Sequence, residues 1–307
     1  MLTRRKFLSI GLMAVIACFT WIHNIYAAPR KLKKKESLSR APFQKNNRHG
    51  KLKSSQRQEN ITTLTEEEIR DYFLKMRNFD KPFPTDIILQ AKEKALLDSS
   101  MAKLTAIQDI VGHGRFYLLS VDEAINVAKR SSIENFSKKE ILFLEELFYV
   151  DASNYGFMDK KPLNSFTATI PQHNVYKVPG MGNFIYKGLA QKKWAEIQKI
   201  IGKDVVLTSG VRGIIKQFYL FLAKAQKHNG NLSLASRSLA PPGYSFHGIG
   251  DFDVGQRGFG YRNFTADFTT TSVYKQLSVS GYLSLRYPKD NFLGVRFEPW
   301  HVKVHSS

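Results

Sequence analysis

The chain reads Pro242-Gly243-Tyr244-Ser245-Phe246-His247-Gly248-Ile249-Gly250-Asp251-Phe252-Asp253 across its most informative stretch. This stretch places a histidine and two aspartates behind a turn-forming Pro-Gly pair. A second stretch, Phe297-Glu298-Pro299-Trp300-His301, adds a glutamate and another histidine. Most plausible metal ligands in the second half of the chain fall into these two segments. We therefore expect the fold to bring them together, although 54 positions separate the two histidines.

Two histidines and one carboxylate suit a catalytic zinc ion, because three protein ligands leave the fourth position for a water whose pKa falls to about 7. Glu298 precedes His301 by three positions, so a carboxylate is available as the base for that water. Residues three apart in a regular strand point to opposite faces. We therefore expect the backbone to depart from strand geometry at Pro299, which cannot donate to a sheet ladder.

Four short motifs resemble, in the same order, those of the zinc D,D-carboxypeptidases of the VanY type, which trim peptidoglycan stem peptides. The resemblance covers about residues 170 to 304 and does not extend to the preceding part of the chain. The motifs are Ser209-Gly210-Val211-Arg212-Gly213 with Gln217, Pro242-Gly243-Tyr244-Ser245-Phe246-His247, Leu285-Arg286-Tyr287-Pro288, and Glu298-Pro299-Trp300-His301.

The resemblance implies one Zn²⁺ as cofactor, with His247 and His301 as ligands and Glu298 as the catalytic base. It further implies that Arg212 holds a substrate carboxylate or the oxyanion, and a planar guanidinium donor fork suits either anion. The residues implied to line the substrate site are Arg212, Gln217, Ser245, Tyr287 and Trp300.

The third ligand is where this sequence departs from the family. The family's Asp follows its first His by seven positions, whereas here Asp253 follows His247 by six and Asp251 by four. Alignment on Asp-Val-Gly favours Asp253, and the loop before it must then absorb one lost residue, because a one-residue slip turns a strand side chain to the other face. Asp251 is the alternative ligand. Val211 and Gly213, where the family has Tyr and Ser, leave the exact substrate open.

The order of expected elements predicts an α+β fold: a small antiparallel sheet with flanking helices, preceded by a helical N-terminal region. Three hydroxyl residues are each followed by Glu three positions on, which predicts several helices between about 65 and 150. Further on, we predict helices at 194–201 and 214–228, a buried strand at 205–208, and two strands joined by a turn within 282–304. The three predicted helix caps are Thr65, Ser120 and Ser137.

The formal net charge of +20 is concentrated near the N-terminus, because residues 1–60 hold 14 basic and 2 acidic side chains. A basic start with Arg4-Arg5, an apolar run to Trp21 and Ala27-Ala28 predict an export signal that resembles the twin-arginine type. An uncleaved membrane anchor and a lipoprotein signal at Cys18 are the alternatives. The basic segment that follows predicts a disordered linker, either a spacer or an attachment to anionic lipid or cell-wall polymer.

We thus predict an export signal at 1–27, a disordered basic linker at 28–60, a helical region at 61–165 and a zinc peptidase domain at 166–307. The predicted function is hydrolysis of the D-amino-acid end of peptidoglycan stem peptides in the periplasm or cell envelope. L,D-carboxypeptidase activity, endopeptidase activity on cross-links and an inactive peptidoglycan-binding module are the alternatives. Nucleic acid is not expected as a partner, because an export signal would remove the protein from it and most of the charge lies within residues 1–60, without interleaved aromatic side chains.

Overall fold

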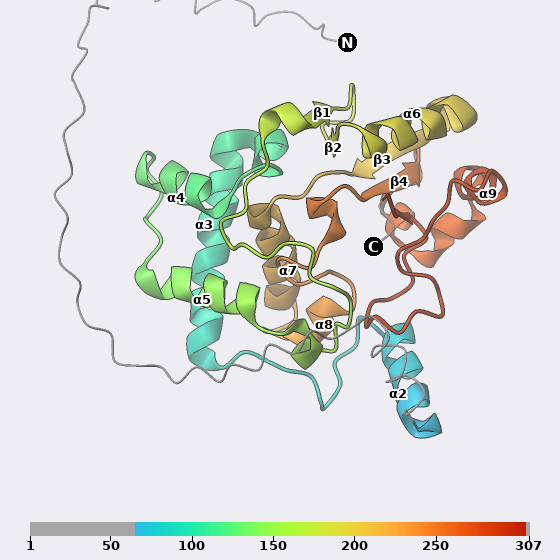
Figure 1. The fold of residues 1–307 in the computed structure, drawn as a ribbon. Helices are drawn as coiled ribbons and strands as arrows, with labels where there is room; N and C mark the ends of the chain where they lie inside the picture. Colours follow the sequence, from blue (N-terminus) through green and yellow to red (C-terminus); the bar gives the residue numbers. More distant parts are fainter. Residues whose placement is uncertain (1–64, 305–307) are drawn as a thin grey trace, which may run out of the picture. The chain divides into compact units, whose positions relative to one another are not determined.

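The structure is a computed structural model that describes residues 65–304 (Figure 1). The predicted export signal at 1–27, its two alternatives and the predicted basic linker at 28–60 lie outside the described residues. The described residues belong to one compact unit, Arg57–Ser307. Within them, no helix combines the length and the apolar composition that crossing a bilayer requires.

Three helices of the first half begin at the hydroxyl caps that the sequence predicts. Each cap hydroxyl accepts a hydrogen bond from the N–H of the glutamate three residues on, whose carboxylate accepts one from the cap's own N–H. The longest helix has no hydroxyl cap: the N–H of Gln90 donates to the Glu93 carboxylate at 2.7 Å. The helices are α2 (Glu66–Arg77), α3 (Ala91–Phe116), α4 (Val121–Lys129) and α5 (Lys138–Tyr149).

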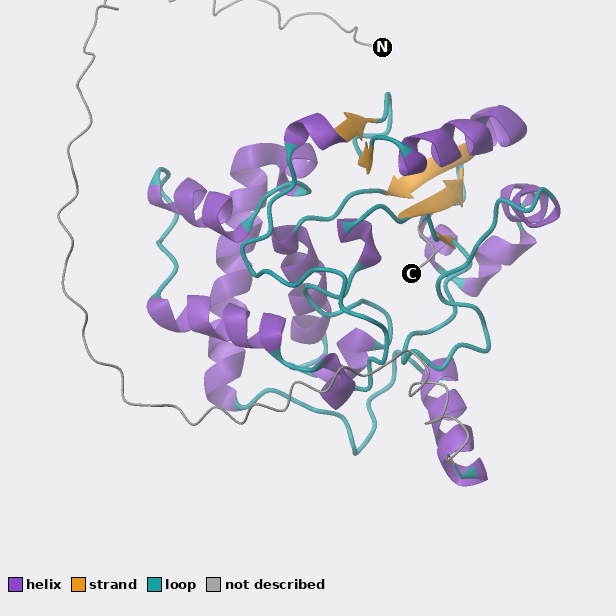
Figure 2. Cartoon of the chain, in the orientation of Figure 1, coloured by secondary structure: helices purple, strands orange, loops and turns teal. Residues whose placement is uncertain are grey.

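The second half of the described chain alternates short strands and helices (Figure 2). The predicted ends of two helices are confirmed: α6 stops at Gly202, which has φ 77°, and the N–H of Gly230 donates to Ala225 O at 2.8 Å just after α7. The helices are α6 (Leu189–Ile201), α7 (Ile214–Lys227), α8 (Leu232–Ser236) and α9 (Ser272–Val279). The strands are β1 (Val175–Lys177), β2 (Phe184–Tyr186), β3 (Val205–Ser209), β4 (Phe252–Gln256) and β5 (His301–Val302).

The sheet that positions the site is antiparallel and has the order β3-β4-β5, while β1 and β2 form a separate hairpin. Leu207 pairs with Val254, and the register then shifts so that Ser209 pairs with Asp253. On its other side, Asp253 pairs with His301. The central strand therefore carries Asp253 between residues from both neighbours. The predicted α+β class with a small antiparallel sheet is confirmed.

The two strands predicted within 282–304 are confirmed only in part. Strand β5 is present, but the earlier partner is reduced to a single bridge between Leu285 and Val302. The backbone beyond it turns away from the ladder, and the N–H of Glu298 donates to Tyr287 O at 3.0 Å. Pro288 and Pro299 lack the N–H that a regular pair of strands would need.

Two large hydrophobic clusters and a small third one around Val211 support the fold of the described residues. The larger one joins α3, α4 and α5 to α7 and includes Phe148, Phe218 and Tyr287; α3 and α5 lie together on one side of α7 in Figure 1. The second large one surrounds Trp194 of α6 and packs that helix and α9 against β3 and β4. The larger cluster includes residues on both sides of the predicted boundary between the helical region at 61–165 and the peptidase domain at 166–307. The helical region therefore shares its core with the segment that carries the predicted site residues.

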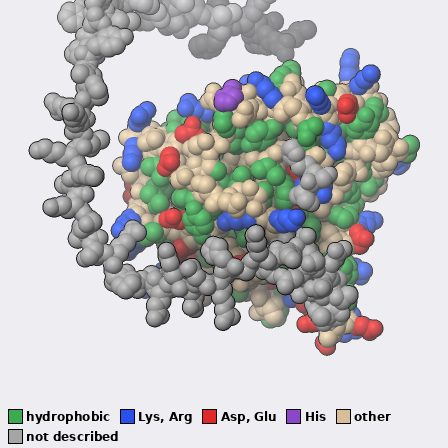
Figure 3. All heavy atoms as spheres, in the orientation of Figure 1, with side chains coloured by type: hydrophobic (Ala, Val, Ile, Leu, Met, Phe, Trp, Pro, Cys, Tyr) green, Lys and Arg blue, Asp and Glu red, His purple; other side chains and the backbone are tan. Residues whose placement is uncertain are grey.

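Charged side chains are interspersed on the face drawn in Figure 3, where Lys and Arg lie among Asp, Glu and apolar groups. No single-sign surface is visible on the described residues of that face. This agrees with the sequence, in which most of the positive excess falls within residues 1–60.

Candidate metal centre

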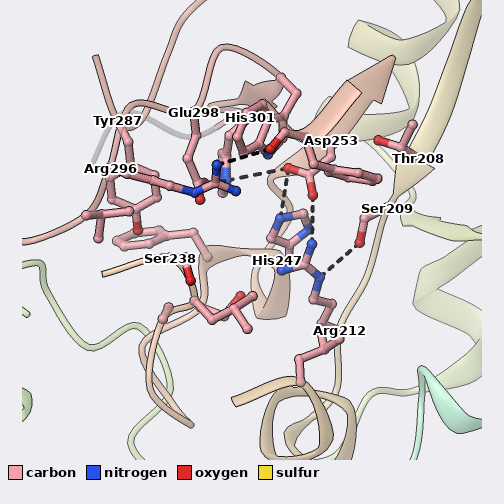
Figure 4. Close-up of a pocket in the computed structure, with 18 of the residues that line it drawn as sticks. Thr208, Ser209, Arg212, Ser238, His247, Asp253, Tyr287, Arg296, Glu298 and His301 are labelled. Carbon is pink, nitrogen blue, oxygen red and sulfur yellow. Dashed lines mark hydrogen bonds and ion pairs between the residues drawn. The ribbon is translucent and has the colours of Figure 1, made fainter. Parts of the chain in front are cut away.

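Three short elements place the predicted metal ligands next to one another. His247 lies in the 3₁₀ turn Phe246–Gly248, Asp253 is the second residue of β4, and His301 is the first residue of β5. One ligand atom from each lies within 4.8 Å of the others, and all three side chains are buried (Figure 4). The turn and the two paired strands thus bring together residues that are up to 54 positions apart.

Each histidine is oriented by a hydrogen bond on the nitrogen that faces away from the group. His247 Nδ1 lies 2.8 Å from the carbonyl oxygen of Gly210; because a carbonyl only accepts, Nδ1 carries the proton. His301 Nε2 lies 3.1 Å from Asp251 Oδ2. The other two nitrogens, Nε2 of His247 and Nδ1 of His301, lie 3.3 and 3.6 Å from Asp253 Oδ1. Such outer hydrogen bonds are typical of histidines that bind metal.

The donor set fits a zinc ion. Among the described residues, His247 Nε2 and Asp253 Oδ1 are buried and have no hydrogen-bond partner, although buried polar atoms are nearly always paired. These two atoms and His301 Nδ1 converge on one point. Two imidazole nitrogens and one carboxylate oxygen are ligands that zinc takes in catalytic sites. One zinc ion, the cofactor expected from the sequence, therefore has a suitable site here.

The electrostatics of the group also favour a cation. Burial alone would lower the pKa of His301, but hydrogen bonds to Asp251 and Glu298 and the charge of Asp253 raise it to about 9. Burial and the charge of Arg212 lower the pKa of His247. Burial would raise the pKa of Asp253, but the charges of His247 and Arg212 lower it to about 2. The carboxylates thus stabilise positive charge where the three ligands meet.

Asp251 and Asp253, the two candidates for the third ligand, occupy different positions in the site. Asp253 belongs to the converging group, whereas Asp251 lies behind His301. Asp251 Oδ2 also accepts from Arg286 Nε at 2.5 Å, and its Oδ1 accepts from the N–H of Val304 at 2.9 Å. Asp251 therefore contacts the outer edge of the His301 ring and connects it to Val304, two residues after β5.

The loop between His247 and Asp253 turns tightly. The backbone N–H groups of Gly250 and Asp251 both donate to Phe246 O, at 3.1 and 3.2 Å. Gly250 has φ 140°, a conformation that residues with a side chain rarely adopt. Together with the register shift between β3 and β4, this turn leaves Asp253 pointing toward the histidines.

Glu298 lies beside the group rather than within it. Its Oε2 is 3.4 Å from His301 Nδ1, and the side chain lines a pocket. The expected departure from strand geometry is present, because the N–H of His301 folds back to donate to Glu298 O at 3.2 Å around Pro299. The side chains of Glu298 and His301 can therefore face the same part of the pocket, although they are three residues apart.

Arg212 contacts the metal group directly. Its Nη2 lies 2.7 Å from Asp253 Oδ2, and its Nε donates to Ser209 Oγ at 2.9 Å. Gln217, which we expected to line the substrate site, is not among the described residues that line the pocket. Its Nε2 donates to Arg212 O and its Oε1 accepts from the N–H of Gly243, both at 2.9 Å. Gln217 thus joins the arginine loop to the Pro-Gly turn.

The pocket beside the ligands has a volume of about 380 Å³ and includes Ser245, Tyr287 and Trp300, as the resemblance implied. The sequence did not point to the other side chains in its wall. Some of these come from the helical region, which the four motifs do not cover, and have no motif that could have revealed them. Others lie on α7 at a multiple of four residues from one another. This spacing is a signal in the sequence that they share one helix face. The unforeseen lining residues include Phe79, Tyr117, Lys216, Lys224, Phe264 and Arg296.

Phe79 reaches the pocket because a buried ion pair fixes the segment that carries it. Arg237, the residue after α8, pairs with Asp86 at 2.7 Å. The same guanidinium donates to the carbonyl oxygens of Phe79 and Lys81, at 3.3 and 2.9 Å. The chain between α2 and α3 is therefore attached to the peptidase-like half next to the site.

Residues 189–306 match the family model of VanY, described as D-alanyl-D-alanine carboxypeptidase. This match largely coincides with the stretch, about residues 170 to 304, for which the four motifs predict the same family. The comparison with curated proteins found no match.

Among solved structures, the chain is similar to the LdcB LD-carboxypeptidase, with 26% identity and a TM-score of 0.34 over 39% of this chain and 59% of that one. It is also similar to a mutant of the vancomycin resistance D,D-pentapeptidase VanY in complex with Zn(II), with 22% identity and a TM-score of 0.37 over 49% of this chain and 88% of that one. VanYB in complex with D-Alanine-D-Alanine gives the same identity and TM-score over 49% and 86%. The chain thus spans less than two thirds of the LdcB structure.

Proposed function

We propose that this protein is an exported zinc carboxypeptidase that removes the C-terminal D-amino acid from peptidoglycan stem peptides. The observation that carries the proposal is the convergence of three buried ligand atoms from His247, Asp253 and His301, with the Glu298 carboxylate beside them in the pocket wall. The match of residues 189–306 to the VanY family supports the same activity and substrate.

Each side chain has a distinct role in the proposed reaction. Zinc, when bound, would polarise the scissile carbonyl and lower the pKa of water in the pocket. Glu298 accepts the proton of the attacking water and returns it to the leaving amine, because its carboxylate lies beside the ligands and faces the pocket. Arg212 orients Asp253 through the 2.7 Å contact and supplies positive charge for the oxyanion or the terminal carboxylate.

The geometry of the three ligand atoms favours an enzyme over a binding module. A module was an alternative because the loop before Asp253 is one residue shorter than in the family. The tight turn at Gly250 nevertheless leaves all three ligand atoms within 4.8 Å of one another, so the shortened loop does not remove a ligand from the group. D,D-carboxypeptidase activity is the proposed specificity, and L,D-carboxypeptidase or endopeptidase activity remains the alternative within the same chemistry.

Export and the linker complete the proposal. The signal predicted at 1–27 would deliver the protein to the periplasm or cell envelope, where stem peptides are found. The basic segment at 28–60 would hold it near anionic lipid or cell-wall polymer by charge attraction. Fractionation of cells that produce the full chain tests the location, and retention in the cytoplasm would contradict it.

The activity is tested by incubating the zinc-loaded protein with defined muropeptides and measuring product masses. We expect the pentapeptide to lose one D-Ala and the tetrapeptide to remain intact; the opposite result would assign L,D specificity. Glu298→Gln should lower the rate by at least about a hundredfold while zinc stays bound. Glu146→Gln, on the exposed face of α5, is the matched control. Full activity in Glu298→Gln would contradict the proposed base.

A further inference from the structure

One face of helix α7 forms part of the pocket wall. Lys216, Leu220 and Lys224 follow one another at a spacing of four residues, and all three line the pocket. Residues four apart lie one above the other on a helix, so these side chains form a row along α7. Arg296 contributes to the pocket from the loop before β5. Figure 4 shows Arg296 and Arg212 on opposite sides of His247.

Lys216 is a buried cation without a carboxylate partner among the described residues. Its side chain is 7% exposed, and its Nζ donates to the Gln108 side chain at 3.3 Å. The rings of Tyr117 and Tyr219 each lie 4.8 Å from the same nitrogen. Burial, followed by the charge of Arg212, lowers the pKa of Lys216 to about 8. An anionic ligand would offset the cost of keeping this ammonium charged.

Arg296 is held in place yet not neutralised by an ion pair within the described chain. Its guanidinium lies 4.5 Å from the ring of Phe79 and 4.7 Å from that of Trp300, and Nη1 donates to Phe264 O at 3.1 Å. Its Nε is buried without a hydrogen-bond partner. The aromatic rings fix the direction of the guanidinium within the pocket wall.

Lys224 and Arg296 repel each other. Burial lowers the pKa of Lys224, and the charge of Arg296 lowers it further, while Asp80 has the opposite effect. Burial lowers the pKa of Arg296, and the charges of Glu298, Asp253 and Asp80 raise it, but none of these carboxylates forms an ion pair with Arg296 or Lys224 in the described structure. An anion that binds between two like charges in a pocket wall offsets their mutual repulsion.

The row of side chains on α7 is too long for one carboxylate to contact both of its ends. Lys216 and Lys224 are eight residues apart on a helix that rises about 1.5 Å per residue, which separates them by about 12 Å along the axis. A carboxypeptidase leaves one residue beyond the scissile bond, and one residue spans at most about 3.6 Å. The terminal carboxylate of the substrate therefore cannot reach both ends of the row.

We propose that Lys224 and Arg296 form a second anion subsite, which binds a free carboxylate carried by a residue on the N-terminal side of the scissile bond. The substrate class is thus an acidic peptide with a carboxylate besides the terminal one. This inference rests on the proposed peptidase function and adds a specificity determinant to it.

The test compares two synthetic stem pentapeptides that differ only in whether the internal carboxylate is free or amidated. Their affinities for the zinc-loaded Glu298→Gln protein are measured by calorimetry, so that hydrolysis does not interfere. Lys224→Met should weaken binding of the free-acid peptide about tenfold and leave the amidated peptide within about twofold. Arg296→Gln should show the same selective loss. Lys227→Met, an exposed neighbour on α7 outside the pocket wall, is the control and should change neither affinity.

Equal weakening of both peptides by Lys224→Met, or no weakening of either, would overturn the subsite. A matching loss in Lys227→Met would also overturn it, because the effect would then be a general one of net charge. Selective loss in the two pocket variants without hydrolysis by the unaltered protein would sustain the subsite and contradict the proposed activity. Failure of both peptides to bind would contradict both.

Discussion

At the scale of single residues, the His301 ring lies between two aspartates that are two positions apart. Asp251 contacts Nε2 on one edge and Asp253 faces Nδ1 on the other. Side chains two apart along an extended chain point to the same face, which allows one short segment to supply both contacts. Asp251 determines which nitrogen of the ring carries the proton, and Asp253 lies among the metal ligands.

Exchanging these two aspartates for asparagine separates their roles. Asp253→Asn removes a charged ligand and should abolish stoichiometric zinc binding, whereas Asp251→Asn should weaken zinc binding by about ten- to a hundredfold through loss of ring orientation. Competition with a chromophoric chelator measures both affinities. A larger loss in Asp251→Asn than in Asp253→Asn would assign Asp251 as the ligand.

Sequence reasoning at this scale works where a motif fixes chemistry. The spacing of Glu298 and His301 correctly required a backbone turn at Pro299. The family resemblance implied that Gln217 lines the substrate site, while in the structure its side chain is hydrogen-bonded to two backbone groups. A motif shows that a side chain is needed, but not whether it faces substrate or supports the neighbouring loop.

At the scale of elements, a buried ion pair connects α3 to α5. Lys103 Nζ lies 2.8 and 2.7 Å from the two carboxylate oxygens of Glu140, and both side chains are buried. Burial would raise the pKa of Glu140, but hydrogen bonds from Lys103 and from the N–H of Ser137 lower it to about 2. Glu140 thus completes the capping box of α5 and also fixes that helix against α3.

Glu140→Gln should lower the free energy of unfolding at neutral pH by about 3 kcal/mol, because it leaves the Lys103 ammonium buried without its main partner. Glu134→Gln is the matched control: Glu134 is exposed and 3.7 Å from the same nitrogen, so the loss should stay below about 1 kcal/mol. Urea unfolding measures both values, and equal losses in the two variants would contradict this role for the pair.

The same pair predicts a dependence on pH. The pKa of Glu140 is lowered from 4.5 to about 2 on folding, so its contribution is complete above pH 4.5 and declines as the pH falls toward 2. Unfolding curves at a series of pH values should therefore show a smaller loss of stability on acidification for Glu140→Gln than for the unaltered protein. An identical pH profile for the two proteins would contradict the assignment.

Helix starts were predictable where a hydroxyl residue and a glutamate form a capping box, as at Thr65, Ser120 and Ser137. The start of α3 was not predicted because Gln90 replaces the hydroxyl residue. Two strands were expected within 282–304, yet in the earlier one only Leu285 pairs. Arg286 and Tyr287, which follow Leu285, are both buried next to the site instead of alternating between core and solvent.

At the scale of the whole molecule, the hydrophobic core extends beyond the segment that the family model matches. Leu104 and Phe148 of the helical region pack in the same cluster as Phe218 of α7 and Tyr287 of the pocket. Motifs could predict the site within the C-terminal half, but not that Phe79 and Tyr117 of the helical region line its pocket. Contacts between distant segments leave no local pattern in a single sequence.

This shared core predicts that the C-terminal half does not fold alone. A fragment of residues 166–307 would expose the apolar face of α7 that α3 covers, whereas residues 65–307 retain the complete cluster. We expect a cooperative thermal transition and zinc binding for the longer fragment and neither for the shorter one. Circular dichroism and metal titration measure both properties, and a cooperative, zinc-binding 166–307 fragment would contradict the prediction.

The central claim is that the chain holds one zinc ion on His247, Asp253 and His301. Anomalous diffraction from crystals of the zinc-loaded protein, recorded above and below the zinc absorption edge, tests it most directly. We predict a single strong peak about 2.0–2.2 Å from His247 Nε2, His301 Nδ1 and a carboxylate oxygen of Asp253, with Asp251 outside the coordination sphere. Absence of a peak at this position, or a peak coordinated by Asp251 in place of Asp253, would contradict the claim.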